Sequence, residues 1–151
     1  SAVPPRSRRG PWLGRRTVRS MSPQLNALGI VTSDLFGSVR FYRHLGVEVG
    51  DPAEGESHVE ATLPGGLRIM WDTVEVAQSI HPEARPGGGG GATFAFACDG
   101  AADVDATYAR LIDEGYSGRN EPWDAPWGQR YAVVEDPDGN PVDLFAPLDP
   151  R

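Results

Sequence analysis

The chain has 151 residues and a formal net charge of −7, with 21 acidic residues, 14 arginines and no lysine. Six of the arginines lie in the first 20 residues, which contain no acid, so the remainder carries 14 − 6 = 8 arginines against 21 acids, a net charge of −13. A body this acidic repels nucleic acid and anionic membranes, and it mildly favours neutral or cationic ligands.

Residues 1–21 are predicted to be a disordered, arginine-rich extension. They are rich in Pro, Gly and Ser and contain no apolar stretch, so a nucleic-acid-binding arm is the less favoured alternative. Met21 and Ser22 are predicted to begin the fold. A chain of this length buries one core but is short for two, so residues 22–151 are expected to form one domain.

The sequence also indicates a cytoplasmic protein. No apolar segment typical of a secretory signal follows the arginines, and no run approaches the roughly 20 apolar residues of a membrane span. The single cysteine, Cys98, cannot form an internal disulfide. We therefore expect no membrane partner.

The first half of the domain is predicted to be a βαβββ unit. Its strands are expected at Leu25–Thr32, Val47–Val49, His58–Leu63 and Leu67–Trp71. Asp34 is a suitable N-cap for an amphipathic helix that stops at Gly46. Residues 72–91 then form a connector with a short helix over Val74–Ile80, since two prolines and five consecutive glycines disfavour regular structure in the rest of it.

The second half repeats this pattern. A strand over Ala92–Cys98 precedes a helix that Asp103 is expected to cap and Gly115 to end. The capping Asp and the final Gly are 12 positions apart in both halves, which indicates an internal repeat.

The last segment of the chain is predicted to carry the binding site. Glu121–Gly128 contains two tryptophans among Pro, Asp, Ala and Gly, which is typical of a loop. It leads into a strand over Arg130–Glu135, a turn at Asp136–Asn140 and a returning strand over Pro141–Ala146. Loops on a rigid sheet are common ligand-binding positions, so we expect an aromatic rim here.

Two βαβββ modules with Asp-Pro-Asp-Gly-Asn in the final hairpin resemble the vicinal oxygen chelate superfamily of glyoxalases, extradiol dioxygenases and antibiotic resistance proteins. The resemblance covers Leu25–Leu148. It implies an α+β fold of paired modules, about 25–71 and 92–148, whose mixed sheets curl into an open cup with the helices outside.

The resemblance also indicates where the ligands of a metal site would lie. Metal-dependent members of the superfamily take one ligand from the first strand of each module and a carboxylate from the last strand. The matching positions here are Ala27, Thr93 and Asp143, so only Asp143 retains a possible ligand. One carboxylate does not hold a divalent ion against water, and the three histidines of the chain are not placed as an alternative set. We expect no metal, no cofactor and no catalytic residue.

Strand alternation predicts what lines the cup instead. The inward residues of the first strand of each module are small and nearly uncharged: Ala27, Gly29, Val31, Thr93, Ala95 and Ala97. The third strand is expected to turn His58, Glu60 and Thr62 inward. This lining leaves room for a bulky ligand.

A closer resemblance rests on three segments. Gly65–Glu75, Pro122–Ala132 and Val142–Leu148 are similar to the mitomycin-binding resistance proteins and related drug-sequestering members of the superfamily. The resemblance implies a planar drug held between His58 and Trp127. The other residues expected to contact the ligand are Trp123, Trp71, Glu60, Tyr131 and Arg130. For Trp71 and Trp123, core packing is the alternative role. The glycine-rich connector departs from the family pattern.

The sequence therefore predicts a self-resistance protein that sequesters a flat, quinone-like antibiotic of the mitomycin, anthraquinone or enediyne type without converting it. We expect a homodimer whose cups are lined by both chains, with or without exchanged modules. The alternative is a metal-independent or atypical glyoxalase-like or dioxygenase-like enzyme on a small oxygenated substrate, with Asp143 or Glu60 as base. A paralogue that binds no ligand is the least favoured reading, because exposed tryptophans are costly.

Overall fold

The first module is a three-stranded sheet with one helix on one face. The computed structural model describes residues 23–87 and 92–148; the expected extension over residues 1–21 and the start at Met21 lie outside this range. The strands are β1 (Ala27–Thr32), β2 (His58–Thr62) and β3 (Arg68–Thr73). β3 lies in the middle, parallel to β1 and antiparallel to β2. The helix is α2 (Leu35–His44), and Asp34 caps it as expected by accepting from the Gly37 amide at 2.9 Å.

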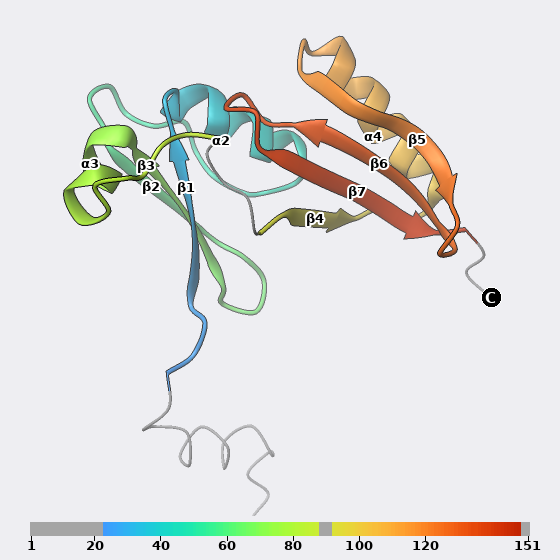
Figure 1. Cartoon of the computed structure of the whole chain (residues 1–151), viewed down its shortest axis with the longest axis horizontal. Helices are drawn as coiled ribbons and strands as arrows, with labels where there is room; N and C mark the ends of the chain where they lie inside the picture. The colour runs from blue at the N-terminus through green and yellow to red at the C-terminus, as the bar shows by residue number, and fades with distance from the viewer. Residues whose placement is uncertain (1–22, 88–91, 149–151) are drawn as a thin grey trace, which may run out of the picture.

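The second module repeats this topology with one more strand. Its strands are β4 (Phe94–Ala97), β5 (Ser117–Ala125), β6 (Gln129–Glu135) and β7 (Pro141–Pro147). The order β4-β7-β6-β5 matches β1-β3-β2 over three strands, including the parallel pairing of the first and last strand of each module, which supports the predicted repeat. Figure 1 shows the two modules side by side, with α4 (Ala101–Asp113) packed on one face of the second sheet.

The fold class is confirmed. The described residues form an α+β fold with three helices and two curled, unclosed mixed sheets. The third helix, α3 (Val74–Ile80), lies in the connector where the sequence predicts it. None of these helices is long and apolar enough to cross a membrane.

Three local predictions are wrong. The segment Val47–Val49 forms no strand: Val47 is buried in the core, but the segment pairs with no neighbour, so the first sheet lacks a counterpart of β5. α4 begins two residues before Asp103, with Gly100 at the N-cap. Asp103 therefore lies in the first turn, where the positive end of the helix dipole stabilises a carboxylate.

The tryptophan-containing segment is also more regular than predicted, because β5 continues to Ala125. Pro122 does not prevent pairing, since the register shifts between Asn120 and Trp123 and leaves it in a bulge of an edge strand. Only residues 126–128 form a turn, so the aromatic rim stands on a hairpin and not on a long loop.

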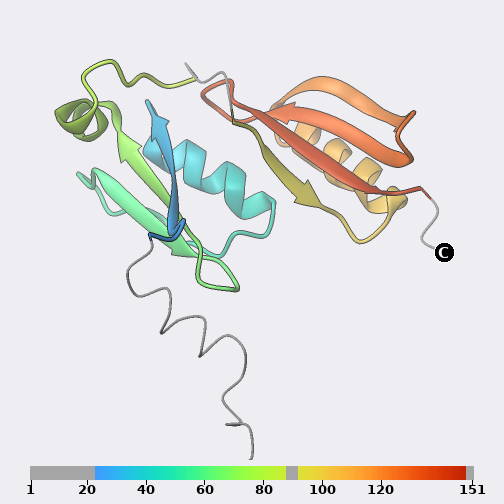
Figure 2. The same cartoon turned by 60° about the horizontal axis from the view of Figure 1, so that its bottom comes forward.

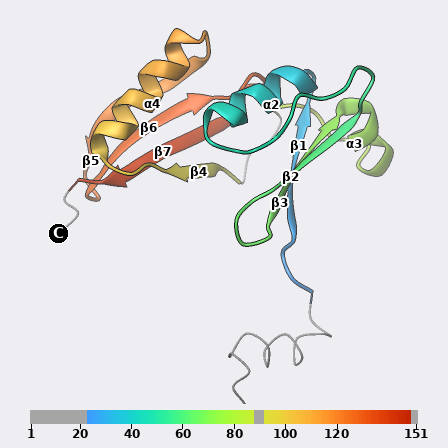
Figure 3. The same cartoon turned by 180° about the vertical axis from the view of Figure 1, so that it is seen from behind.

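Both modules contribute to one hydrophobic core, and α2 lies between the two sheets (Figures 2 and 3). Tyr42 of α2 is 1% exposed and meets aromatic rings from both sheets, with centroid distances of 6.0 Å to Trp71 and 6.1 Å to Phe94. Its hydroxyl donates to the buried carboxylate of Asp136 at 2.8 Å. This hydrogen bond ties α2 to the turn between β6 and β7.

The Tyr42→Phe variant tests this connection. Losing the hydroxyl leaves a buried carboxylate short of one donor, so the free energy of unfolding should fall by about 1–3 kcal/mol. Urea unfolding followed by circular dichroism measures the change. Tyr108→Phe is the matched control, because the Tyr108 hydroxyl makes no hydrogen bond among the described residues. Equal stability of the two variants would show that the buried bond adds nothing.

Candidate functional site

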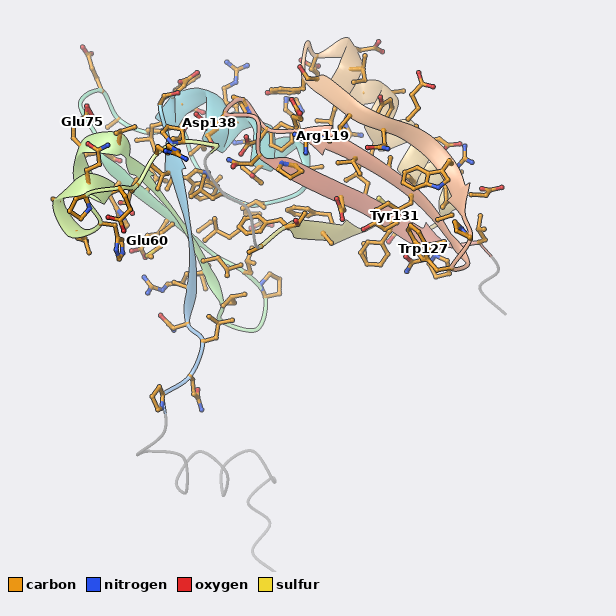
Figure 4. All side chains as sticks on the ribbon, viewed as in Figure 1. Glu60, Glu75, Arg119, Trp127, Tyr131 and Asp138 are labelled. Carbon is orange, nitrogen blue, oxygen red and sulfur yellow. The ribbon has the colours of Figure 1, made fainter. Side chains whose placement is uncertain are left out.

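The face of the second sheet opposite α4 carries an aromatic half-site, consisting of Trp123, Trp127, Tyr131 and Phe145. Strand register places Tyr131 opposite both Trp123 and Phe145. The ring centroids of Trp123 and Trp127 both lie close to that of Tyr131, at 5.5 and 5.3 Å. Trp127 is 58% exposed and projects from the hairpin beside Tyr131 (Figure 4).

The hairpin fixes the exposed indole. Gly128 has a φ of +92°, which a tight turn needs, and its amide donates to the Ala125 carbonyl at 3.0 Å. The Trp127 Nε1–H group donates to Oε1 of Gln129 at 2.9 Å. One indole is therefore both accessible and held in orientation.

A carboxylate lies next to these rings. The Tyr131 hydroxyl donates a short hydrogen bond to Asp143 of β7. Burial, and then the hydrogen bond to Asp143, raise the pKa of Tyr131 to about 12. The phenol therefore stays protonated at neutral pH and acts as the donor.

The first module carries a charged half-site on the sheet face opposite α2, consisting of His58, Glu60, Arg68 and Asp72. Nδ1 of His58 is 2.5 Å from Asp72 and Nε2 is 2.8 Å from Glu60. Glu60 is also bound by Arg68 at 2.8 Å. The ring is thus fixed along the sheet surface, with the side chain 40% exposed.

The two carboxylates determine the protonation state of the histidine. The hydrogen bond to Asp72 raises the pKa of His58 most, and the bond to Glu60 raises it further. His58 and Arg68 in turn lower the pKa of Glu60. With a carboxylate on each ring nitrogen, both nitrogens act as donors, as in an imidazolium ion.

The residues expected to bind one ligand fall into two groups. Trp127, Trp123 and Tyr131 come together on the second module, and His58 and Glu60 come together on the first. Figure 4 shows the two groups at opposite sides of the chain, marked by Glu60 and Trp127. A single chain therefore does not place a ligand between His58 and Trp127.

Two of the residues expected to contact the ligand lie on the covered faces of the sheets. Trp71 is fully buried and packs against Tyr42, because it shares the helix-covered face with Ile30, its partner in register. Arg130 lies on the face covered by α4, where Asp105 and Asp124 bind its guanidinium at 2.8 and 2.9 Å. Trp71 precedes Asp72 and Arg130 precedes Tyr131, and these neighbours lie on the open faces of the sheets. Side chains alternate between faces along a strand, so Trp71 and Arg130 point to the covered faces.

The alternation predicted for the lining is confirmed. Thr93, Ala95 and Ala97 are exposed, whereas Phe94 and Phe96 pack against the core.

Sequence reasoning missed Phe145 and Asp72 as site residues. The register of the two hairpins carries the missing signal, since it pairs them with Tyr131 and His58. Among the described residues, no three His, Cys, Asp or Glu side chains are grouped as a metal site.

Comparison with known proteins agrees with this fold. The sequence model of the "Glyoxalase/Bleomycin resistance protein/Dioxygenase superfamily" matches residues 24–144. A glyoxalase/bleomycin resistance protein/dioxygenase from Nocardioides is 24% identical, with a TM-score of 0.64, covering 92% of this chain and 95% of its own. No curated protein matches the chain.

Two further solved structures share the fold at lower identity. A hypothetical protein from S. aureus has a TM-score of 0.71 at 16% identity, covering 87% of this chain and 98% of its own. A lactoylglutathione lyase from Agrobacterium tumefaciens has a TM-score of 0.59 at 22% identity, covering 83% and 93%. At these identities the similarity establishes the fold alone.

The protonation state of His58 gives a prediction. Its imidazole should titrate above the ordinary pKa of about 6.5, and Asp72→Asn should lower this pKa more than Glu60→Gln, since Asp72 is the larger cause. NMR titration of the ring protons, assigned with His58→Gln, measures the three values.

The same shift predicts a dependence of stability on pH. The folded pKa lies above the unfolded one, so the stabilisation by Asp72 is fully present below about pH 6.5 and is lost as the pH rises through the folded pKa. The stability difference between wild type and Asp72→Asn should shrink over that interval. A His58 pKa at or below the ordinary value would contradict the hydrogen bonding of its two ring nitrogens to Asp72 and Glu60.

Proposed function

Because the chain belongs to the glyoxalase/bleomycin resistance protein/dioxygenase superfamily, we propose that it is a drug-binding member, which sequesters a flat, quinone-like cytotoxic natural product without converting it. The observation that carries this proposal is the aromatic half-site, with Trp127 58% exposed on a fixed hairpin. An indole held open to solvent in this way is typical of a stacking surface for a planar ligand.

The binding site is completed by a second chain. The charged and aromatic half-sites lie on separate modules, and both are open within one chain. β1 and β4 are edge strands of their sheets, so each sheet has an edge that a partner can approach. We place the charged half-site of one chain opposite the aromatic half-site of its partner, in a homodimer with two equivalent cups.

The physical scale suits sequestration by a cytoplasmic protein in a cell that makes the drug. An aromatic pair contributes about 0.5–1.5 kcal/mol beyond area burial. A ligand of roughly 25 heavy atoms at about −0.3 kcal/mol per atom reaches about −8 kcal/mol, a micromolar complex. Mitomycin-type and anthraquinone-type compounds are flat molecules of this class.

The runner-up is an enzyme that uses Asp143 as base on a small oxygenated substrate. The adjacency of Asp143 to Tyr131 favours it, because a carboxylate and a protonated phenol form an acid–base pair. Glu60 is a poor base, since His58 and Arg68 lower its pKa.

Titration of the protein with a panel of quinone antibiotics, followed by mass analysis of the recovered ligand, separates these functions. We expect at least one compound to bind in the micromolar range and to be recovered unchanged. Trp127→Ala should weaken that complex by at least tenfold, because a stacking face worth about 1.5–3 kcal/mol is lost.

His58→Ala should cost less than Trp127→Ala, since imidazole offers a smaller face. Trp123→Ala is the control within the half-site, and it should act mainly through the stability of the hairpin. Recovery of a compound of altered mass would favour the enzyme, and an unchanged affinity of folded Trp127→Ala would move the site elsewhere.

A further inference from the structure

Asp143 differs from the other acidic side chains on the two open sheet faces. Glu60 and Asp72 are paired with His58, and Glu135 is bound by Arg119 at 2.6 Å. Asp143 has no cationic partner among residues 23–87 and 92–148, where its hydrogen bond comes from the neutral Tyr131 hydroxyl. It is therefore a carboxylate whose charge no described side chain balances.

The surroundings of Asp143 are mostly apolar and aromatic. Its partners in strand register are Ala95 on β4 and Val133 on β6. Phe145 follows two residues later on the same face and stacks on Tyr131 at 6.4 Å. A charge among apolar and aromatic side chains is stable when a counter-charge meets it, and closure of the cup would remove the water that serves this purpose in the open face.

We infer that Asp143 binds a protonated amine, so that the sequestered compound is a planar aromatic molecule carrying a basic amino group. This inference rests on the proposed function and names the ligand class for the same site. The Tyr131 hydroxyl holds one carboxylate oxygen, and the other accepts no hydrogen bond among the described residues, so it is available to an ammonium donor.

Two further features favour a cation at this position. The faces of Trp127 and Tyr131 carry negative π-density, which attracts a cation bound beside them. The chain beyond its first 20 residues has a net charge of −13, from 8 arginines and 21 acids, which raises the local concentration of cationic ligands. The planar ring would stack on Trp127 while the amine reaches past Tyr131 to Asp143.

A matched pair of probes tests the inference on the full chain. One is an anthraquinone with an aminoethylamino side chain, and the other is its hydroxyethylamino counterpart, which keeps the ring and tether but lacks the charge. In calorimetric titrations at neutral pH the wild-type protein should bind the amine about tenfold more tightly. Asp143→Asn should abolish this preference.

Asp113→Asn is the control for net charge, because it removes one negative charge from an exposed position of α4. It should keep the preference for the amine. If Asp143→Asn does not fold, as judged by circular dichroism, the Asp143→Ser variant is titrated in its place, because it lacks the same charge.

The outcomes separate the inference from the function on which it rests. Equal affinity of the wild type for both probes overturns the inference and leaves the proposed sequestration standing. A preference that persists in the folded Asp143 variant overturns the assignment to Asp143. Failure of both probes to bind overturns the inference and the proposed function together.

Discussion

The buried hydrogen bond from Tyr42 to Asp136 is the constraint on which the arrangement of the two modules depends. Asp136 is 3% exposed and also accepts from the Asn140 amide and side chain at 2.9 and 2.8 Å. The Asp136 carboxylate therefore stabilises the β6–β7 turn and also connects this turn to α2. Ser33 adds a second tie, since its amide and hydroxyl both donate to Asp138 of the same turn. Burial, and then Asp136, raise the pKa of Tyr42, so the donor keeps its proton.

This attachment decides where the binding chemistry lies. α2 covers one face of the first sheet and α4 covers one face of the second, so the opposite faces stay open and each carries a different surface. The first sheet presents a histidine held by two carboxylates, and the second presents aromatic rings around one carboxylate. Neither surface encloses a planar ligand alone. Together they provide a cationic ring on one side and an exposed indole on the other, which is the basis of the shared cup that we propose.

The sequence predicts the local features well because they depend on neighbours in the chain. The Asp34 cap, the β6–β7 hairpin and the alternation that turns His58 away from Ala61 all follow from short-range rules. Pairing and packing across the fold were not predictable in this way. The bulge that admits Pro122 into β5, and the ion pairs that hold Arg130 against α4, depend on residues distant in sequence.

The most direct test of the shared cup combines two defective chains. A heterodimer of a Trp127→Ala chain and a His58→Ala chain, purified through two different affinity tags, contains one cup with both rings and one cup with neither. The shared cup predicts one site of wild-type affinity per heterodimer, although each parent homodimer binds weakly. A heterodimer that binds as weakly as its parents, or no heterodimer at all, would contradict the proposal that the two chains complete each other's sites.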